Sequence, residues 1–378
     1  MTKLEQLIDE LCPNGVEYKK LSELLNIQRG VRVVRNQLND TGEYPVYQNS
    51  LIPMGYHTAS NFPANTTFII GAGAAGEIGY SYVDFWAADD CFCIICPDEY
   101  NSRFLFHYLL SQQEFLLSKV RKASIPRLSR TVIENLKLPV PPLQVQSEIV
   151  RILDNFTELT AELTAELTAR KKQYEYYTEQ LMNFGEGVKM ISLGEIGSVK
   201  MCKRILKSQT NTTGGIPFYK IGTFGKEPDA FISEELFEEY KEKYSYPRKG
   251  DILISCSGTI GRTVVFDGEP AYFQDSNIVW LEHDGTIVTN KYLRYCYKKQ
   301  PWQISTGGTI ARLYNDNILK AKIPVPSIEE QERIVEILER FDILCNDISE
   351  GLPAEIEGRR KQYEHYRDKL LTFKELSK

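Results

Sequence analysis

Three things are scarce in this sequence: histidine, long apolar runs and phosphate-binding glycine motifs. Only four histidines occur in 378 residues, and they are scattered along the chain. Hydrolytic centres usually depend on grouped histidine and acidic residues, so the scatter argues against them. No apolar run approaches the ~18 residues that a membrane-spanning helix needs. The absence of GxxxxGK[ST] and of an Asn/Asp-Pro-Pro-aromatic string argues against nucleotide hydrolysis and amino-group methylation.

The first residues, MTKLEQLIDELC, have the pattern of an acidic amphipathic helix. A secretory signal would instead place basic residues before an apolar core. We therefore expect a cytosolic protein without a membrane partner, in which the eight cysteines stay reduced. Cys91, Cys93 and Cys96 lie in an apolar, strand-like run without a fourth ligand nearby. Buried strand cysteines are favoured there over a zinc site, and we expect no metal.

The formal net charge of −6 at first argues against nucleic acid, but the acidic residues are unevenly distributed. Residues 144–184 carry −3 and residues 329–374 carry −4, which leaves +1 for the remainder. Nucleic-acid binding is indicated by where basic residues gather rather than by the total charge. The sequence therefore permits basic surfaces outside the two acidic segments.

The chain is a direct repeat of one long unit. LPVPPLQVQSEIVRILDNF (138–156) aligns with IPVPSIEEQERIVEILERF (323–341) at an offset of 185. RKKQYEYYTEQLMNF (170–184) aligns with RRKQYEHYRDKLLTF (359–373) at an offset of 189. Shorter matches pair VEYKKLSEL with VKMISLGEI and YPVY with IPFY at an offset of 172, and IPRL with IARL. Between these landmarks the copies differ, which predicts two equivalent units with different specificities.

Two segments have the periodicity of long helices. Apolar residues recur at steps of three and four over residues 149–184 and 334–373, as in a coiled-coil seam with stutters. Each helix would span about 40 residues, or roughly 60 Å. An ordinary buried bundle helix is the alternative, but this length favours antiparallel pairing of the two. Gly351 and Pro353 interrupt the second copy and predict a kink or a restart. The predicted seam residues are Ile149, Ile152, Phe156, Leu159, Leu163, Leu167, Tyr174, Tyr177 and Leu181, then Ile334, Ile337, Phe341, Leu344, Ile348, Tyr363, Tyr366 and Leu370.

The intervening parts, residues 16–137 and 188–322, contain short β-runs broken by Gly, Pro and Asn. A helical pattern follows in each, over residues 102–120 and 290–304. The fold class is therefore mixed α+β. We expect two α/β globular domains separated by two long helices that form an antiparallel coiled coil, with a pseudo-twofold internal repeat.

Two motifs compete as catalytic signals. Gly71–Gly76 matches GxGxxG, but a dinucleotide or methyl-donor site needs a helix to follow, and the next residues alternate like a strand. A tight loop between strands is favoured. Asp229, Glu239 and Lys241 fit a loose PD…ExK nuclease pattern, although the second element lies in a charged helical pattern. A stand-alone nuclease or methyltransferase, and a purely structural scaffold, stay open as alternatives.

Three basic stretches are candidate DNA contacts. Residues 119–137 carry six basic residues and one acid, residues 199–207 carry four basic residues, and a third cluster begins at Arg29. Basic side chains attract phosphates irrespective of sequence, whereas a few side chains at groove edges read bases. Arg127 and Arg312 hold matching places in IPRL and IARL and are the favoured pair; a solvated surface is the alternative. The other candidates are Arg121, Lys122, Arg130, Arg32, Arg35, Lys200, Lys203, Arg204 and Lys207.

The first helix contains a repeated tetrapeptide, TAEL, within residues 157–172. The four-residue difference between the two repeat offsets falls at this place. Four residues add about 6 Å of helix. We interpret the repeat as a device that sets the distance between two DNA-reading domains.

CPNGVEYKKLSEL (12–24), PVPPLQVQSEIVRILD, the TAEL tetrapeptides and RKKQYEYYTEQL resemble the specificity subunit of type I restriction–modification systems. The resemblance covers nearly the whole chain. It implies an N-terminal segment and first target-recognition domain in residues 1–143, a helical spacer in 144–187, a second target-recognition domain in 188–328 and a second spacer in 329–378.

The same resemblance implies that each domain reads one half of a split, asymmetric site in double-stranded DNA, with unspecified base pairs between the halves. It implies that the helices bind two modification subunits, which use S-adenosylmethionine to methylate adenine. Restriction subunits that use ATP and Mg²⁺ would complete the nuclease. This chain would then hold neither a catalytic centre nor a cofactor.

Overall fold

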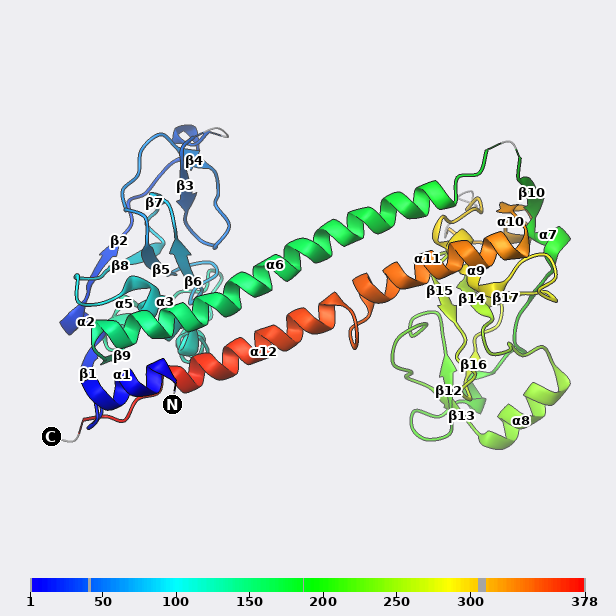
Figure 1. Cartoon of the computed structure of the whole chain (residues 1–378). Coiled ribbons are helices and arrows are strands. Elements are labelled where there is room, and N and C mark those ends of the chain that lie inside the picture. Colours follow the sequence, from blue (N-terminus) through cyan, green and yellow to red (C-terminus); the bar gives the residue numbers. More distant parts are fainter. Residues whose placement is uncertain (1, 40–41, 186, 305–310, 377–378) are drawn as a thin grey trace. The chain divides into compact units, whose positions relative to one another are not determined.

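The computed structural model describes residues 2–39, 42–185, 187–304 and 311–376. Ile310, the first residue of the IARL match, lies outside them. The chain divides into unit 1, residues 1–166 and 352–378, and unit 2, residues 167–351. Each unit contains a sheet-rich domain and two long helical segments (Figure 1).

The domain of unit 1 contains three small sheets. The largest is antiparallel, in the order β2 (Asn26–Arg29), β8 (Cys91–Ile95), β5 (Thr66–Ile70), β6 (Ile78–Ser81). The second is mixed, in the order β4 (Tyr56–His57), β3 (Tyr44–Tyr47), β7 (Trp86–Ala87), with β3 parallel to β7. The third pairs β1 (Glu17–Lys20) with β9 (Lys137–Val140). The central strand β5 is buried along its whole length, as its unbroken TTFII run predicts.

The domain of unit 2 repeats this topology strand for strand. Its largest sheet has the order β11 (Ser198–Lys200), β17 (Ile278–Glu282), β14 (Ile252–Ser255), β15 (Thr263–Val265). Its mixed sheet has the order β13 (Phe231–Ile232), β12 (Ile216–Tyr219), β16 (Tyr272–Phe273), with β12 parallel to β16. Its third sheet pairs β10 (Lys189–Ser192) with β18 (Lys322–Val325). The predicted internal repeat is therefore confirmed at the level of strand pairing.

Short helices complete each domain. Unit 1 has α1 (Lys3–Leu11), α2 (Leu21–Leu24), η1 (Arg35–Gln37), α3 (Ser102–Ser111), α4 (Gln113–Ser118) and α5 (Arg130–Glu134). Unit 2 has α7 (Leu193–Ile196), η2 (Lys207–Gln209), α8 (Glu234–Lys243), α9 (Asn290–Lys298) and α10 (Asn315–Lys320). Side chains of the preceding residues, Asn101 and Thr289, cap α3 and α9.

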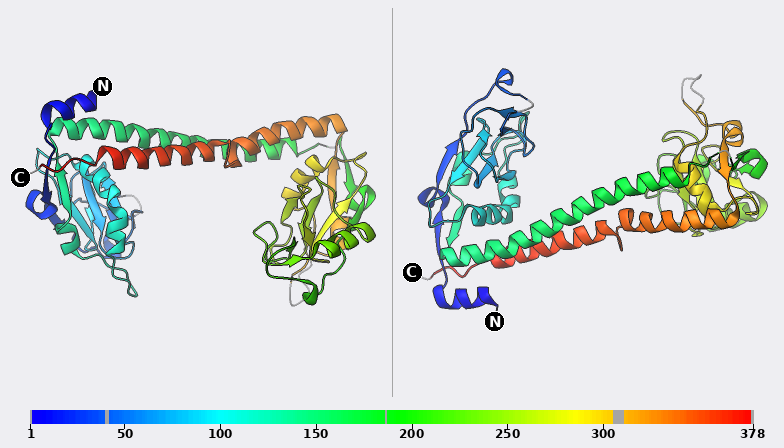
Figure 2. Two further views of the ribbon diagram at one scale, coloured as in Figure 1. Left: turned by 90° about the horizontal axis from the view of Figure 1, so that it is seen from below. Right: turned by 45° about the horizontal axis from the view of Figure 1, so that its top comes forward.

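The long helical segments are α6 (Leu143–Leu181), α11 (Ile328–Asn346) and α12 (Leu352–Leu370). In unit 1 the first part of α6 packs on α12, where Phe156 stacks on Tyr366 with ring centroids 5.3 Å apart. In unit 2 the last part of α6 packs on α11, where Tyr177 stacks on Phe341 at 5.5 Å. Within each unit the paired segments are antiparallel (Figure 2). Ile149 and Ile334, at the starts of the two seams, are fully buried against the sheet-rich domains.

The second helical segment is interrupted between α11 and α12, so the restart that Gly351 and Pro353 predict is confirmed. α11 ends at Asn346, and the Asp347 carboxylate accepts hydrogen bonds from two backbone N–H groups of the turn that follows. A side chain at Gly351 would collide with the Ile343 carbonyl. Ile348 lies in this turn and is 86% exposed, so its predicted place in the seam is wrong.

None of the helices within the described ranges combines the length and the apolar character that crossing a membrane requires. Cys91 and Cys93 lie fully buried in β8, which confirms the favoured interpretation for these two cysteines, whereas Cys96 follows the strand and is half-buried. Burial raises the pKa of the Cys91 thiol to about 12.

Candidate nucleic-acid interface

The IPRL segment of unit 1 lies in a tight hairpin. The backbone N–H of Arg121 donates to the Arg127 carbonyl at 2.8 Å, and the reverse hydrogen bond measures 3.2 Å. Residues 122–126 at the tip are exposed, and so is the side chain of Arg127. The next residue, Leu128, is buried and donates its N–H to the carbonyl of Gly71 at 2.9 Å. The hairpin is thereby fixed to the loop that follows β5.

Residues 311–313 of the IARL match hold the equivalent place in unit 2. Leu313 is buried and donates its N–H to the carbonyl of Cys256 at 2.9 Å, directly after β14. Arg312 donates from Nη2 to the Ser276 carbonyl at 2.6 Å, and its guanidinium lies 5.9 Å from the ring centroid of Tyr314. The predicted match between Arg127 and Arg312 is therefore confirmed in position. Their contact with DNA stays a prediction.

The basic residues near positions 32 and 204 also form an equivalent pair, which the sequence reasoning did not identify. Arg35 begins η1 and Lys207 begins η2. In each turn the glutamine two residues after the cation, Gln37 or Gln209, accepts a hydrogen bond from the backbone N–H of the residue just before the cation. The distances are 2.9 Å from Val34 and 2.8 Å from Leu206. Arg32 and Arg204 lie three residues earlier. The offset of 172, already visible in YPVY and IPFY, was the signal that could have found this match.

The basic segments of unit 1 are linked to one another through hydrogen bonds to backbone carbonyls. Arg29 Nε donates to the carbonyl of Asp89, and the N–H of Gly71 donates to the carbonyl of Asp90 at 2.6 Å. Gly71 in turn accepts from Leu128. The end of β2, the turn after β7 and the hairpin of Arg127 therefore lie next to one another.

Unit 2 repeats this arrangement with different side chains. Arg204 and Arg312 both bond to the turn formed by residues 275–277. Arg204 Nε pairs with the carboxylate of Asp275 at 3.0 Å, while Arg312 donates to the carbonyl of Ser276. Two arginines from distant parts of the sequence are thus brought to one place.

A hollow of about 550 Å³ lies beside this turn in unit 2. Its basic residues are Arg204, Lys207 and Lys220, and Lys220 pairs with Asp229 at 2.9 Å. Two amide side chains on its wall accept hydrogen bonds through their oxygens. Gln274 Oε1 accepts from the N–H of Ile221 at 3.0 Å. Asn277 Oδ1 accepts from Ser257 Oγ at 2.8 Å. Their NH₂ groups can then donate to acceptors on base edges.

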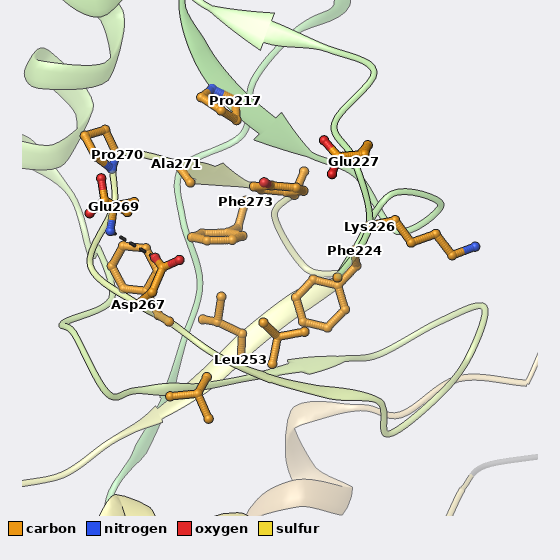
Figure 3. Close-up of a pocket in the computed structure, with 15 residues that line it drawn as sticks. Pro217, Phe224, Lys226, Glu227, Leu253, Asp267, Glu269, Pro270, Ala271 and Phe273 are labelled. Atoms are coloured by element: carbon orange, nitrogen blue, oxygen red, sulfur yellow. Dashed lines mark hydrogen bonds between the residues drawn. The ribbon is translucent and has the colours of Figure 1, made fainter. Parts of the chain in front are cut away.

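A second hollow in unit 2, of about 400 Å³, has a different chemistry. Figure 3 shows Phe224 and Phe273 facing its interior, with Lys226 pointing away. Carboxylates of Asp267, Glu269 and Glu227 lie around it. Acidic groups repel phosphates, so this aromatic hollow is not suited to the DNA backbone.

Several predicted contact residues have local partners. Arg130 pairs with Glu134 at 2.8 Å, and Lys200 pairs with Glu282 at 3.5 Å. The ammonium group of Lys203 lies 5.1 Å from the ring centroid of Tyr244. Arg121 and Lys122 are exposed beside Arg127, and Arg32 is exposed as well. Contact of these residues with DNA stays a prediction.

The glycine motif connects two strands. β5 and β6 pair antiparallel on either side of it, so no helix begins there, as expected. Gly73 and Gly76 have φ values of +83° and +92°, which favour glycine, and a side chain at Gly73 would collide with Asn49. The motif therefore lacks the helix N-terminus that a nucleotide cofactor requires.

The residues of the nuclease pattern have separate partners. Asp229 pairs with Lys220, and Glu239 pairs with Lys243 at 3.1 Å within α8. Lys241 lies over the ring of Phe237 at 5.2 Å. In the parts of the chain that the structure describes, no three histidine, cysteine, aspartate or glutamate side chains are placed to hold a metal ion.

Comparison with known proteins gives a consistent result. A family model for the type I restriction modification DNA specificity domain matches residues 13–170 and 185–358, the two copies of the repeat. A protein of Haemophilus influenzae, named as a type I restriction enzyme specificity subunit, is 50% identical over 387 aligned residues, which cover 98% of this chain and 98% of the relative. The specificity subunit of the Escherichia coli enzymes EcoR124I and EcoR124II is 39% identical over 258 residues, 63% of each chain.

Solved structures show the same architecture. The crystal structure of the S subunit of the type I restriction-modification system from M. genitalium superposes with a TM-score of 0.63 at 18% identity, covering 94% of this chain and 96% of that chain. A chain from a study of assembly of the type I restriction-modification system has a TM-score of 0.56 at 18% identity, covering 96% and 98%. These likenesses concern the fold alone.

Proposed function

The chain belongs to the family of type I restriction–modification DNA specificity proteins, and from this membership we propose that its two domains read the two halves of a split DNA site. The target-recognition domains would occupy residues 1–143 and 188–328, with helical spacers in 144–187 and 329–378. The chain would act in the cytoplasm, where its DNA substrate lies.

One observation carries the proposal of a bipartite, asymmetric site. The two domains share their strand pairing and the position of Arg127 and Arg312, but the loops beside these arginines differ in sequence. GAGAAG follows β5, whereas CSGTIG follows β14. Equal frames with unequal loops place two different sets of side chains in equivalent positions. Two different half-sites follow from that arrangement.

Within each domain we assign two kinds of contact. Exposed cations on the η1 and η2 turns, Arg35 and Lys207, would bind phosphates and set the register on the duplex. Arg127 and Arg312 would reach base edges, where arginine most often bonds to guanine. Gln274 and Asn277 would add donors in the second half-site.

We propose that the chain performs no chemistry itself. Its glycine loop joins antiparallel strands and does not fit a nucleotide cofactor, and the two carboxylates of its nuclease pattern pair with lysines. S-adenosylmethionine, ATP and Mg²⁺ would be bound by the partner subunits. The modification subunits would methylate adenine, and restriction subunits would cut DNA.

The helices offer two equivalent surfaces for modification subunits. Phe156 stacks on Tyr366 in unit 1, and the matching Phe341 stacks on Tyr177 in unit 2. Tyr366 and Tyr177 are 41% and 39% exposed, so each stack presents an aromatic edge to solvent. Aromatic side chains of this kind dominate the binding energy of many interfaces. One such surface in each unit is consistent with two modification subunits per chain.

Methylation-site sequencing tests the proposed function. The chain would be expressed with the modification subunits of its own system in a host without other DNA methylation. We expect one motif with two specified halves and a fixed number of unspecified base pairs between them. A contiguous motif would contradict the proposal. Methylation or cleavage of DNA by the purified chain alone, with labelled S-adenosylmethionine or Mg²⁺, would favour the enzyme alternative.

A further inference from the structure

A buried histidine connects the recognition domain of unit 1 to two helices. His107 on α3 is fully buried. Its Nε2 lies 2.8 Å from the carboxylate of Asp154 on α6, and its Nδ1 lies 2.9 Å from the hydroxyl of Tyr363 on α12. An ionised carboxylate can only accept, so Nε2 carries the hydrogen and Nδ1 accepts from the tyrosine hydroxyl. One domain side chain thus bonds to both helices.

The surroundings of His107 hold this geometry in place. Arg103 Nε donates to the same Asp154 oxygen at 2.8 Å. The Arg103 guanidinium lies 4.5 Å from the ring centroid of Phe106 and 4.8 Å from that of Tyr80. Burial lowers the pKa of His107, which keeps the imidazole neutral. Burial acts to raise the pKa of Asp154, but the His107 hydrogen bond and the Arg103 charge bring it below its ordinary value.

Unit 2 makes the same connection with different side chains. Arg294 on α9 pairs with Asp342 of α11 at 2.9 Å. Lys298, one turn later on α9, donates to the hydroxyl of Tyr174 on α6 at 2.8 Å. Tyr174 also donates to the Asp342 carboxylate at 3.4 Å. A domain helix is therefore bonded to both long helical segments in unit 2 as well.

The two tyrosines are the same residue of the internal repeat. Tyr174 ends the string RKKQY and Tyr363 ends RRKQY, which align at the offset of 189. Each domain has a further polar connection of this kind, which reaches one of its two helices. The side-chain oxygens of Gln146 on α6 and Gln331 on α11 accept from the backbone N–H that begins α3 or α9, at 2.7 Å and 2.9 Å. The tyrosine hydroxyls add a bond to the second helix of each pair.

We propose that Tyr363 in unit 1 and Tyr174 in unit 2 are positioning residues that fix the angle of each recognition domain on its pair of helices. This inference rests on the proposed function. Apolar side chains of the second helix, such as Leu370 in unit 1 and Leu181 in unit 2, also pack on the domain core, but such contacts have no fixed direction. Hydrogen bonds to both helices are directional and oppose tilting. A base pair rises only about 3.4 Å along the duplex. A domain that tilts would therefore tolerate a spacer one base pair longer or shorter, while reading the same bases.

The test replaces each tyrosine by phenylalanine, which keeps the ring and removes the hydroxyl. Tyr363→Phe and Tyr174→Phe would be expressed with the modification subunits in a methylation-free host. Methylation would then be sequenced at sites whose spacers differ by one base pair. Tyr176→Phe is the matched control, because Tyr176 is a helix tyrosine with 56% of its surface exposed.

We expect both half-sites to stay unchanged in the two variants. The preference for the correct spacer should fall about fivefold to tenfold, the factor of a lost hydrogen bond. The control should keep the full preference. Uniform loss of methylation at every spacer, with a lower Tm, would show a role in stability alone and overturn the inference. An unchanged spacer preference in both variants would overturn it too.

The wild-type chain separates this inference from the proposed function. If the wild type methylates no split site, the proposed function fails. If the wild type methylates one split site and both phenylalanine variants keep its spacer preference, only the positioning role fails. Because the two variants lie in different units, poor folding of one leaves the other as a test.

Discussion

Unit 1 and unit 2 differ most in the residues between strands. The loop after β5, residues 71–76, carries only glycine and alanine, whereas the loop after β14 carries Ser257 and Thr259. Arg127 is exposed on a hairpin, whereas Arg312 is held by the Ser276 carbonyl. The residues that fix these segments do not differ, since Leu128 and Leu313 bond to equivalent carbonyls. Under the proposed function, the shared frame would set where each domain contacts DNA, and the loops would set which bases it reads.

The largest expected effect comes from shortening the helix that both units share. Deleting Thr164–Leu167 removes about 6 Å of α6. At about 3.4 Å per base pair, the spacer should shorten by one or two pairs while both half-sites stay unchanged. Methylation-site sequencing measures this directly. Glu162→Gln changes the charge of the same helix without its length and is the control. A changed half-site at the original spacing would contradict the interpretation that the TAEL repeat sets the distance between the two DNA-reading domains.

The next effect separates the two half-sites. Arg127→Ala should relax one base position in one half-site, and Arg312→Ala should relax one in the other, each by about 1–3 kcal/mol of discrimination. Methylation-site sequencing of the two variants would show which half changes. Arg340→Ala should stay within about 0.5 kcal/mol, because Arg340 lies on α11, pairs with Glu336 and is not a candidate DNA contact. Unchanged half-sites in both variants would favour the scaffold alternative.

A smaller and uniform effect is expected from the cations on the two matching turns. Arg35→Ala and Lys207→Ala should weaken DNA binding of the assembled complex at all sequences alike. Each should lower the slope of log affinity against log salt by about one, since each removes one phosphate contact. Salt titration of DNA binding measures this. A loss confined to one sequence would instead assign base reading to these residues.

The smallest effect concerns the acid stability of unit 1. Hydrogen bonds from Arg151 and Lys3 lower the pKa of Glu148 from its ordinary 4.5 to about 2. Because the folded value is lower, this contribution is complete above about pH 4.5 and is lost as the pH falls toward 2. Unit 2 has Arg333 at the matching position of its repeat.

Glu148→Gln should lower Tm by roughly 2–4 °C at pH 7. The difference from the wild type should shrink as the pH falls from 4.5 toward 2, as followed by thermal unfolding. Glu336→Gln is the control, because Glu336 pairs with Arg340 on the exposed face of α11. If the Tm difference from the wild type were the same for both variants and did not change with pH, the stabilising role of the Glu148 carboxylate would be contradicted.

Local patterns in the sequence were sufficient for the fold class, the repeat and the extent of α6. The buried TTFII run predicted a strand, and glycine and proline predicted the break near residue 351. The exposure of Ile348 could not be predicted, because apolar periodicity continues through a turn that Asp347 forms. Spacing predicted Tyr363 as a seam residue, but the hydroxyl of Tyr363 bonds to His107, which lies 256 positions away in the sequence. Such a contact has no local signature.

The central claim is that two domains with the same strand topology recognise different half-sites in DNA. Its most direct test is methylation-site sequencing of a chain in which residues 188–322 replace residues 16–137, so that both units carry the second domain. The account predicts a motif made of two copies of the half-site that unit 2 reads. Two unlike halves, or the original motif, would contradict it.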